Sequence, residues 1–104
     1  MPNLKTIDAT ELAEQAIRGI ADKTLTHAKL ILFGSRARGD ASSRSDFDLA
    51  VFPLEGFEDS ELLEFSEQLE ESPKIIYPLD IIDARDASPA VLAKVRKEGR
   101  VWKN

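Results

Sequence analysis

Residues 29–52, KLILFGSRARGDASSRSDFDLAVF, decide the fold because they contain two apolar runs separated by a polar loop. The first run, residues 29–33, is short and nearly continuous, which indicates a buried strand. The second run, Phe47–Phe52, predicts another strand, because a proline and a glycine follow it. The Arg-rich and Ser-rich residues 35–45 have room for at most a short helical turn. We therefore expect two strands joined by a polar loop.

The flanking sequence predicts three helices and a third strand. Apolar residues recur at helical spacing over residues 8–22, with Asp8 as N-cap, and over residues 58–71. A run over residues 75–83 predicts a strand, with an edge position or a bulge at its proline, and Ser88-Pro89 begins a helix that ends near Gly99. The expected fold class is α/β (α+β), a small mixed β-sheet of about three core strands with helices packed on it.

Length and composition restrict the classes of function. A chain of 104 residues fits one compact domain, residues 1–104, and its 42% hydrophobic and 32% charged residues are ordinary for a soluble protein. No apolar run reaches the roughly 18 residues of a membrane span, and no signal peptide is visible, so we expect a cytoplasmic protein without membrane contact. Without cysteine, the metal ligands left are carboxylates and the lone His27, expected to be a loop residue. A hard, oxygen-ligated cation is favoured.

The negative charge is concentrated in one segment. The net charge is −5, and residues 55–71 contain eight carboxylates and no Lys or Arg, so the rest of the chain carries +3. Within that segment, Glu61, Glu64 and Glu67 are expected to point away from the core as a solvated helix face, or alternatively as a surface that docks on a basic partner. No direct binding to nucleic acid is expected.

Asp46 and Asp48 are the first candidate site residues. One residue separates them at the start of a strand, so their side chains point to the same face. Two carboxylates a few ångströms apart repel each other unless a cation lies between them, and oxygen ligands suit Mg²⁺. The alternative interpretation is a turn aspartate followed by a solvated strand residue.

Gly34-Ser35, directly after the first strand, is a candidate phosphate site. Glycine lets the backbone approach a phosphate closely, and Ser35 offers a hydroxyl and an N–H at the start of the next turn. The alternative is a simple turn that ends a strand.

Together these residues form the pattern Gly-Ser-x10-Asp-x-Asp, with Ala-Arg-Gly at residues 37–39 and Ser-Asp-x-Asp-Leu at residues 45–49. This pattern resembles that of the minimal nucleotidyltransferases (MNT), members of the DNA polymerase beta-like nucleotidyltransferase superfamily. The resemblance extends over essentially the whole chain and implies a nucleotidyltransferase core with two Mg²⁺ ions and ATP as substrate.

The resemblance also implies a third catalytic carboxylate on a later strand. Asp80, within Leu79-Asp80-Ile81-Ile82, matches it, and Asp83 is the competitor. Strand residues three apart face opposite ways, so only one of the two can join the site. We select Asp80, because Asp83 leads into polar sequence. The predicted catalytic and metal-binding residues are thus Asp46, Asp48 and Asp80.

The implied nucleotide-binding residues are Gly34, Ser35 and Arg36. Arg36 and Arg44 are positioned to pair with triphosphate oxygens, whereas Arg38 could instead brace the loop by pairing with Asp40 or a catalytic aspartate. Trp102, near the C-terminus, is expected to pack on the core or to anchor a partner.

The activity implied by the resemblance is transfer of an NMP, AMP from ATP, to an acceptor hydroxyl. MNT proteins of this kind commonly accompany a HEPN-domain protein as antitoxin and toxin, which implies protein adenylylation of a HEPN partner. Two alternatives stay open. The protein could be a non-catalytic antitoxin that neutralises its partner by binding, or a small-molecule nucleotidyltransferase of the antibiotic-modifying type, although those carry an added helical domain.

Overall fold

The computed structural model describes residues 8–42 and 44–104; residues 1–7 and Ser43, part of the predicted domain, lie outside the described residues. The helices are α1 (Ala9–Thr24), α2 (Ser35–Arg38), α3 (Asp59–Glu71) and α4 (Pro89–Glu98), with a 3-10 turn, η1, at Ala84–Asp86. The strands are β1 (Ala28–Phe33), β2 (Phe47–Pro53), β3 (Leu79–Asp83) and β4 (Arg100–Lys103). In these ranges no helix combines the length and apolarity needed to cross a bilayer.

The strands form one mixed sheet in the order β3-β2-β1-β4. β1 and β2 are antiparallel neighbours, as predicted, whereas β2 and β3 are parallel. The α+β class is therefore confirmed, but the expectation of about three strands omitted β4. That strand has four residues and follows Gly99 directly, so its sequence is too short and too polar to predict a strand. Trp102 on β4 packs against the main core, which confirms packing over exposure to a partner.

The third strand is shorter than predicted, because it begins at Leu79 rather than at residue 75. Pro78 has no N–H to donate to a ladder, and only its carbonyl takes part, accepting a hydrogen bond from the Phe47 N–H at 3.0 Å. Regular pairing with β2 therefore begins immediately after the proline.

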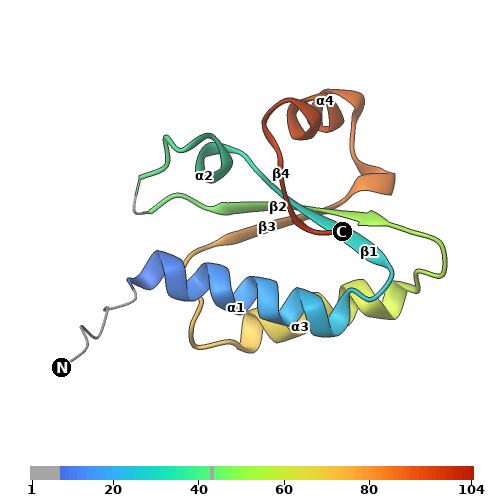
Figure 1. Ribbon diagram of the computed structural model, residues 1–104, viewed down its shortest axis with the longest axis horizontal. Coiled ribbons are helices and arrows are strands. Elements are labelled where there is room, and N and C mark those ends of the chain that lie inside the picture. Colours follow the sequence, from blue (N-terminus) through green and yellow to red (C-terminus); the bar gives the residue numbers. More distant parts are fainter. Residues whose placement is uncertain (1–7, 43) are drawn as a thin grey trace.

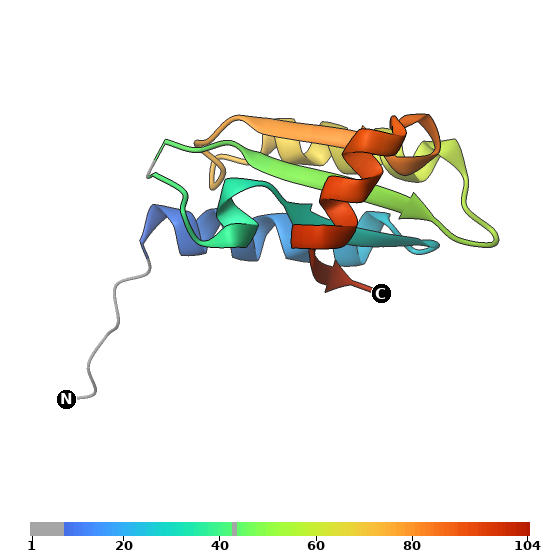
Figure 2. The same ribbon diagram turned by 90° about the horizontal axis from the view of Figure 1, so that it is seen from above.

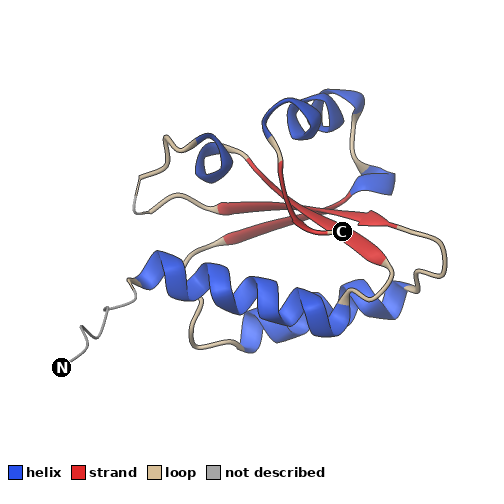
Figure 3. Cartoon of the chain, in the orientation of Figure 1, coloured by secondary structure: helices blue, strands red, loops and turns tan. Residues whose placement is uncertain are grey.

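Helices cover both faces of the sheet. α1 and α3 lie on one face, and α2 and α4 lie on the other (Figures 1 and 3). Viewed from above, α4 runs across the strands (Figure 2). The larger core joins α1 and α3 to alternate strand residues such as Leu30, Phe47 and Leu49, while a smaller core joins Phe33 and Ala50 to α4. Strand alternation therefore assigns Asp48, between Phe47 and Leu49, to the α4 face.

The start of α3 corrects one prediction, because Glu61 does not point outward. It is buried, with 9% of its surface exposed, and one carboxylate oxygen accepts the His27 N–H at 2.9 Å while the other lies 2.9 Å from His27 Nδ1. Glu61 also accepts the Glu58 N–H in a capping box. Helical spacing alone could not show that the first turn of α3 abuts the loop before β1.

Glu61→Gln is expected to lower the free energy of unfolding at neutral pH by about 1–2 kcal/mol. Desolvation raises the pKa of Glu61, but hydrogen bonds from His27 and Glu58 outweigh it and lower the pKa below the usual 4.5. A carboxyl group whose pKa is lowered in the folded state stabilises the fold above pH 4.5. This stabilisation is lost as the pH falls through the lower pKa of the folded state. Urea unfolding of wild type and variant should therefore converge in acid, with the exposed Glu64→Gln as a control that shows no difference.

Candidate active site

Gly34 connects β1 to α2 and lies directly beneath the Asp48 carboxylate. Its φ of +79° is in the region that favours glycine, and a Cβ built there would overlap Asp48 Oδ2 and lie 3.1 Å from Cγ. Only glycine fits both the backbone conformation and the space. The Gly34-Ser35 turn and Asp48 are thus brought into direct contact.

Strand pairing aligns two of the predicted carboxylates. Asp48 is opposite Phe33 on β1 and opposite Asp80 on β3, and Asp46 immediately precedes β2. Desolvation raises the pKa of Asp48, and the charges of Asp80 and Asp46 raise it further. The structure therefore gathers the three predicted aspartates at one end of the sheet, close enough to repel one another.

The aspartate cluster suits a hard cation chemically, although it is not a complete cage of ligands. Across residues 8–42 and 44–104, no three His, Asp or Glu side chains are already arranged as a metal site. Oxygen donors with unbalanced negative charge are what Mg²⁺ prefers, and this ion commonly takes its remaining ligands from water and substrate phosphates. The raised pKa of Asp48 is the shift that an added cation would reverse.

Ser35 is the first residue of α2, next to Gly34. Its carbonyl accepts the N–H groups of Gly39 and Asp40, at 3.0 and 3.2 Å, and thereby closes this short helix. Ser35 is half-buried, and its own N–H lies in the first turn of α2. Phosphate binding by Gly34 and Ser35 stays a prediction.

Arg36 makes contacts that its sequence position did not suggest. Its guanidinium lies over the rings of Phe47 and Tyr77, with centroid distances of 4.1 and 4.5 Å, and Nε donates to the Ser45 carbonyl at 2.9 Å. Those rings belong to the larger core, on the face opposite Asp48. Arg36 therefore ties the loop to the core, and its role as a nucleotide ligand stays a prediction.

Glu98, on the last turn of α4, is a site residue that the sequence did not reveal. Its carboxylate accepts the Gly34 N–H at 3.0 Å and two hydrogen bonds from Arg38 Nη1, at 3.2 and 3.0 Å. Arg38 also pairs with Asp40, as one interpretation of the loop predicted. Sixty-four residues separate Glu98 from Gly34, and no local pattern could have connected them.

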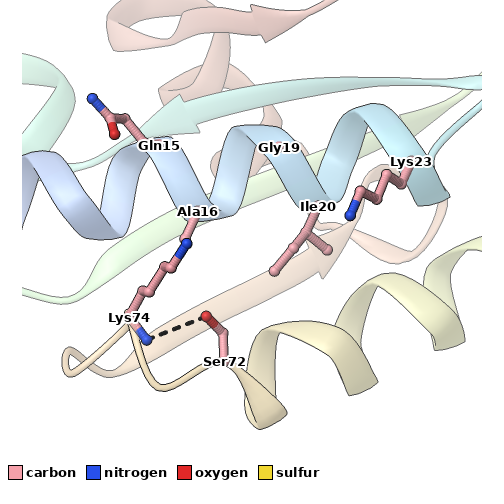
Figure 4. Close-up of a pocket in the computed structure, with 7 residues that line it drawn as sticks. All are labelled: Gln15, Ala16, Gly19, Ile20, Lys23, Ser72 and Lys74. Carbon is pink, nitrogen blue, oxygen red and sulfur yellow. Dashed lines mark hydrogen bonds between the residues drawn. The ribbon is translucent and has the colours of Figure 1, made fainter.

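Two surface depressions of the described residues do not include the aspartate cluster. One, of about 260 Å³, lies between α1 and the segment after α3, where Lys23 and Lys74 line it with Ile20 (Figure 4). The other, of about 330 Å³, is lined by Arg36 and residues of α1 and the loop after α2. Asp46 and Asp80 are exposed instead, so a large acceptor can approach the candidate site directly.

Gly34→Ala is expected to weaken nucleotide binding by at least about tenfold and to destabilise the fold by about 1–3 kcal/mol. The added methyl group must displace the Asp48 carboxylate, and alanine rarely adopts the required φ. Titration with a non-hydrolysable ATP analogue and thermal unfolding measure the two effects. Gly19→Ala is the matched control, since its Cβ meets nothing within 4 Å, and wild-type affinity in Gly34→Ala would contradict the assignment.

Comparison with known proteins identifies the family of this chain. The family model described as Polymerase beta, Nucleotidyltransferase matches residues 15–103, whereas no curated protein sequence matches the chain. Among solved structures, the chain is similar to a candidate minimal nucleotidyltransferase, with 26% identity and a TM-score of 0.65 over 92% of this chain and 97% of that one.

Two further structures share the fold at lower identity. One is a chain of a toxin-antitoxin crystal structure with AMP-PNP, at 23% identity and a TM-score of 0.66 over 86% of this chain and 71% of that one. The other is a chain of a tri-AMPylated Shewanella oneidensis HEPN toxin in complex with MNT antitoxin, at 22% and 0.61 over 88% and 70%. Since the family model spans most of the sequence, this chain belongs to the polymerase beta nucleotidyltransferase family.

Proposed function

We propose that this protein transfers AMP from ATP to an acceptor hydroxyl, with residues 1–104 acting as a single minimal nucleotidyltransferase domain. The observation that carries the proposal is the placement of Asp48, which lies over Gly34 and beside Asp80. A phosphate-binding turn and paired carboxylates then meet at one point, as a reaction between a triphosphate and a hydroxyl requires.

Each group has a defined part in this reaction. Gly34 and Ser35 bind and orient the triphosphate, and Asp46 and Asp48 would hold two Mg²⁺ ions together with Asp80. When bound, Mg²⁺ would neutralise charge that develops on the phosphate oxygens. Asp80, exposed on the edge strand β3, helps to take the proton of the acceptor hydroxyl. The hydroxyl oxygen bonds to the α-phosphorus, and the bond from that phosphorus to the bridging oxygen breaks, so pyrophosphate leaves with the electron pair.

The proposed acceptor is a HEPN-domain toxin, which this protein would silence as an antitoxin in the cytoplasm. Support comes from the similar solved structures, which include toxin-antitoxin complexes and a tri-AMPylated HEPN toxin. The open position of Asp80 also suits a macromolecular acceptor better than a small molecule held in a pocket.

The direct test incubates the protein with α-labelled ATP, Mg²⁺ and a HEPN-domain protein from the same genome. We expect label on the HEPN protein, abolished by EDTA and by Asp46→Asn. Absence of label on the partner under all conditions would refute the proposed transfer. Full inhibition of the partner's ribonuclease activity by Asp46→Asn would instead identify a non-catalytic antitoxin.

Replacing exposed glutamates on α3 is expected to slow association with the HEPN partner. Glu64, Glu67 and Glu70 are exposed, so they can attract a basic ribonuclease surface. The triple Gln variant should associate several-fold more slowly at low salt and show a flatter salt dependence.

The matched control neutralises Asp22, Glu55 and Asp86, which are exposed and lie off α3, so it changes the net charge by the same amount. Stopped-flow association at low and high salt compares the two variants with wild type. If both variants behave alike, α3 is only a solvated exterior and does not guide docking.

A further inference from the structure

Glu98 makes a tertiary hydrogen bond that links the end of α4 to the Gly34-Ser35 turn. Its side chain is only 13% exposed, although it lies at the end of a surface helix. One carboxylate oxygen accepts the Gly34 N–H at 3.0 Å, and both accept Arg38 Nη1. A single carboxylate therefore holds both ends of α2.

The backbone after α4 determines where this carboxylate lies. Gly99 follows immediately, and its N–H closes the helix on the Val95 carbonyl at 2.8 Å. A Cβ at Gly99 would overlap that carbonyl and Ile31 on β1. From there β4 pairs with β1, with Arg100 opposite Leu32. The end of α4 is thus held against the end of β1, where Glu98 meets Gly34.

Without Glu98, the Gly34 N–H would lose its hydrogen-bond acceptor, and Arg38 would keep only a local partner. The Gly34 carbonyl already accepts the N–H groups of Ala37 and Arg38, each at 3.1 Å, but the Gly34 N–H has its partner on α4. The remaining partner of Arg38, Asp40, is two residues away and exposed. Local pairs of exposed charges contribute little to the order of a loop.

The charge of Glu98 does not by itself favour a triphosphate. It raises the pKa of Asp48, so it adds negative potential to a site that should receive a polyanion. Arg38 largely offsets this charge. Desolvation raises the pKa of Glu98, but hydrogen bonds from Arg38 and Gly34 lower it overall, so the carboxylate is ionised at neutral pH. Its contribution to the site is therefore geometric.

We propose that Glu98 is a positioning residue that holds the Gly34-Ser35 turn and Arg38 in the arrangement that receives the triphosphate. This inference rests on the proposed nucleotidyltransferase function. It assigns to α4 a role in nucleotide affinity that lies outside the Gly-Ser and Asp-x-Asp pattern.

The test measures binding of Mg²⁺-AMP-PNP by calorimetry to wild type, Glu98→Ala and Glu98→Gln, at a temperature where circular dichroism shows each to be folded. Glu98→Ala is expected to bind about tenfold more weakly, because the charge-assisted hydrogen bonds of the carboxylate to the Gly34 N–H and to Arg38 are lost. Glu98→Gln keeps an acceptor for the Gly34 N–H but not the ion pair, so its affinity should fall about threefold. With an active acceptor assay, the ATP KM should rise while kcat changes little.

Asp40→Ala is the matched control, because it removes the exposed partner of Arg38 and leaves Gly34 untouched; it should bind like wild type. A lower Tm for Glu98→Ala with wild-type affinity, or tighter binding, would overturn the positioning role. If Glu98→Ala does not fold, an unchanged Glu98→Gln affinity would overturn it as well. If the wild-type protein does not bind the nucleotide at all, the proposed function is refuted, and this inference is refuted with it.

Discussion

Asp48→Asn is expected to lower the rate of AMP transfer by a factor of at least about 10²–10³. The metal-free variant is expected to be no less stable than wild type. The amide keeps the shape of the side chain beneath which Gly34 packs, but it removes one anionic ligand. Asp46→Asn should behave in the same way. Radiolabel transfer and thermal unfolding in EDTA measure the two quantities on the same preparations.

The stability effect has a definite sign with pH. The pKa of Asp48 is raised in the fold, so the folded protein binds more protons than the unfolded chain above the usual value of 3.8. The contribution of Asp48 to the free energy of unfolding therefore falls as the pH rises from 3.8 through the higher pKa of the folded state. At neutral pH the ionised carboxylate destabilises the fold. Asparagine removes this destabilisation, and the gain in stability should vanish below pH 3.8.

Full activity of either variant, Asp48→Asn or Asp46→Asn, with ATP and Mg²⁺ would rule out the proposed metal site.

Asp80→Ala is expected to eliminate activity, whereas Asp83→Ala should retain most of it. Asp80 is paired in register with Asp48, while Asp83 pairs with Val51, three residues further from the site. Asp83 instead accepts hydrogen bonds from Arg85, which lower its pKa.

The two variants should also differ in stability. Asp83→Ala should lower the free energy of unfolding by about 1–2 kcal/mol, because it removes the partner of a half-buried ion pair. Asp80→Ala should leave it unchanged or raise it. Initial rates and urea titrations of the same two proteins provide the comparison. An inactive Asp83→Ala beside an active Asp80→Ala would mean that the functional register of β3 differs from the one described here.

The sequence predicted most of the fold because most of the fold is periodic. The apolar alternation of β1 and β2, the caps at Asp8 and Ser88, and the stripe on α3 each rest on interactions within a few residues. β4 escaped prediction because it has only four residues, and its identity as a strand depends on pairing with β1. Tertiary pairing of that kind leaves no local pattern to read.

The residues of the candidate site also fall into those that the sequence could predict and those that it could not. Gly34, Asp46 and Asp48 lie within one short segment, so their spacing could be read directly. Alternation indicated that only one of Asp80 and Asp83 can join the site, and the polar sequence after Asp83 favoured Asp80. Glu98, by contrast, reaches Gly34 only through the packing of α4 and β4. The buried position of Glu61 and the ring contacts of Arg36 likewise depend on which elements meet. Helical spacing and charge cannot supply that information.

The antiparallel pairing of β1 with β2 places the candidate site and the contact that anchors α3 at opposite ends of the sheet. Gly34 and Asp48 lie at one end, whereas His27 and its partner Glu61 lie at the other, beyond the pairing of Ala28 with Pro53. The mutually repelling carboxylates are thus several residues away from the groups that anchor α3. Substitutions at well-separated sites usually add independently, and gains in stability often reduce activity only where they rigidify a working site. Thermostabilising changes near Glu61 should therefore leave catalytic efficiency intact, which makes this end of the molecule the place to begin engineering a more robust enzyme.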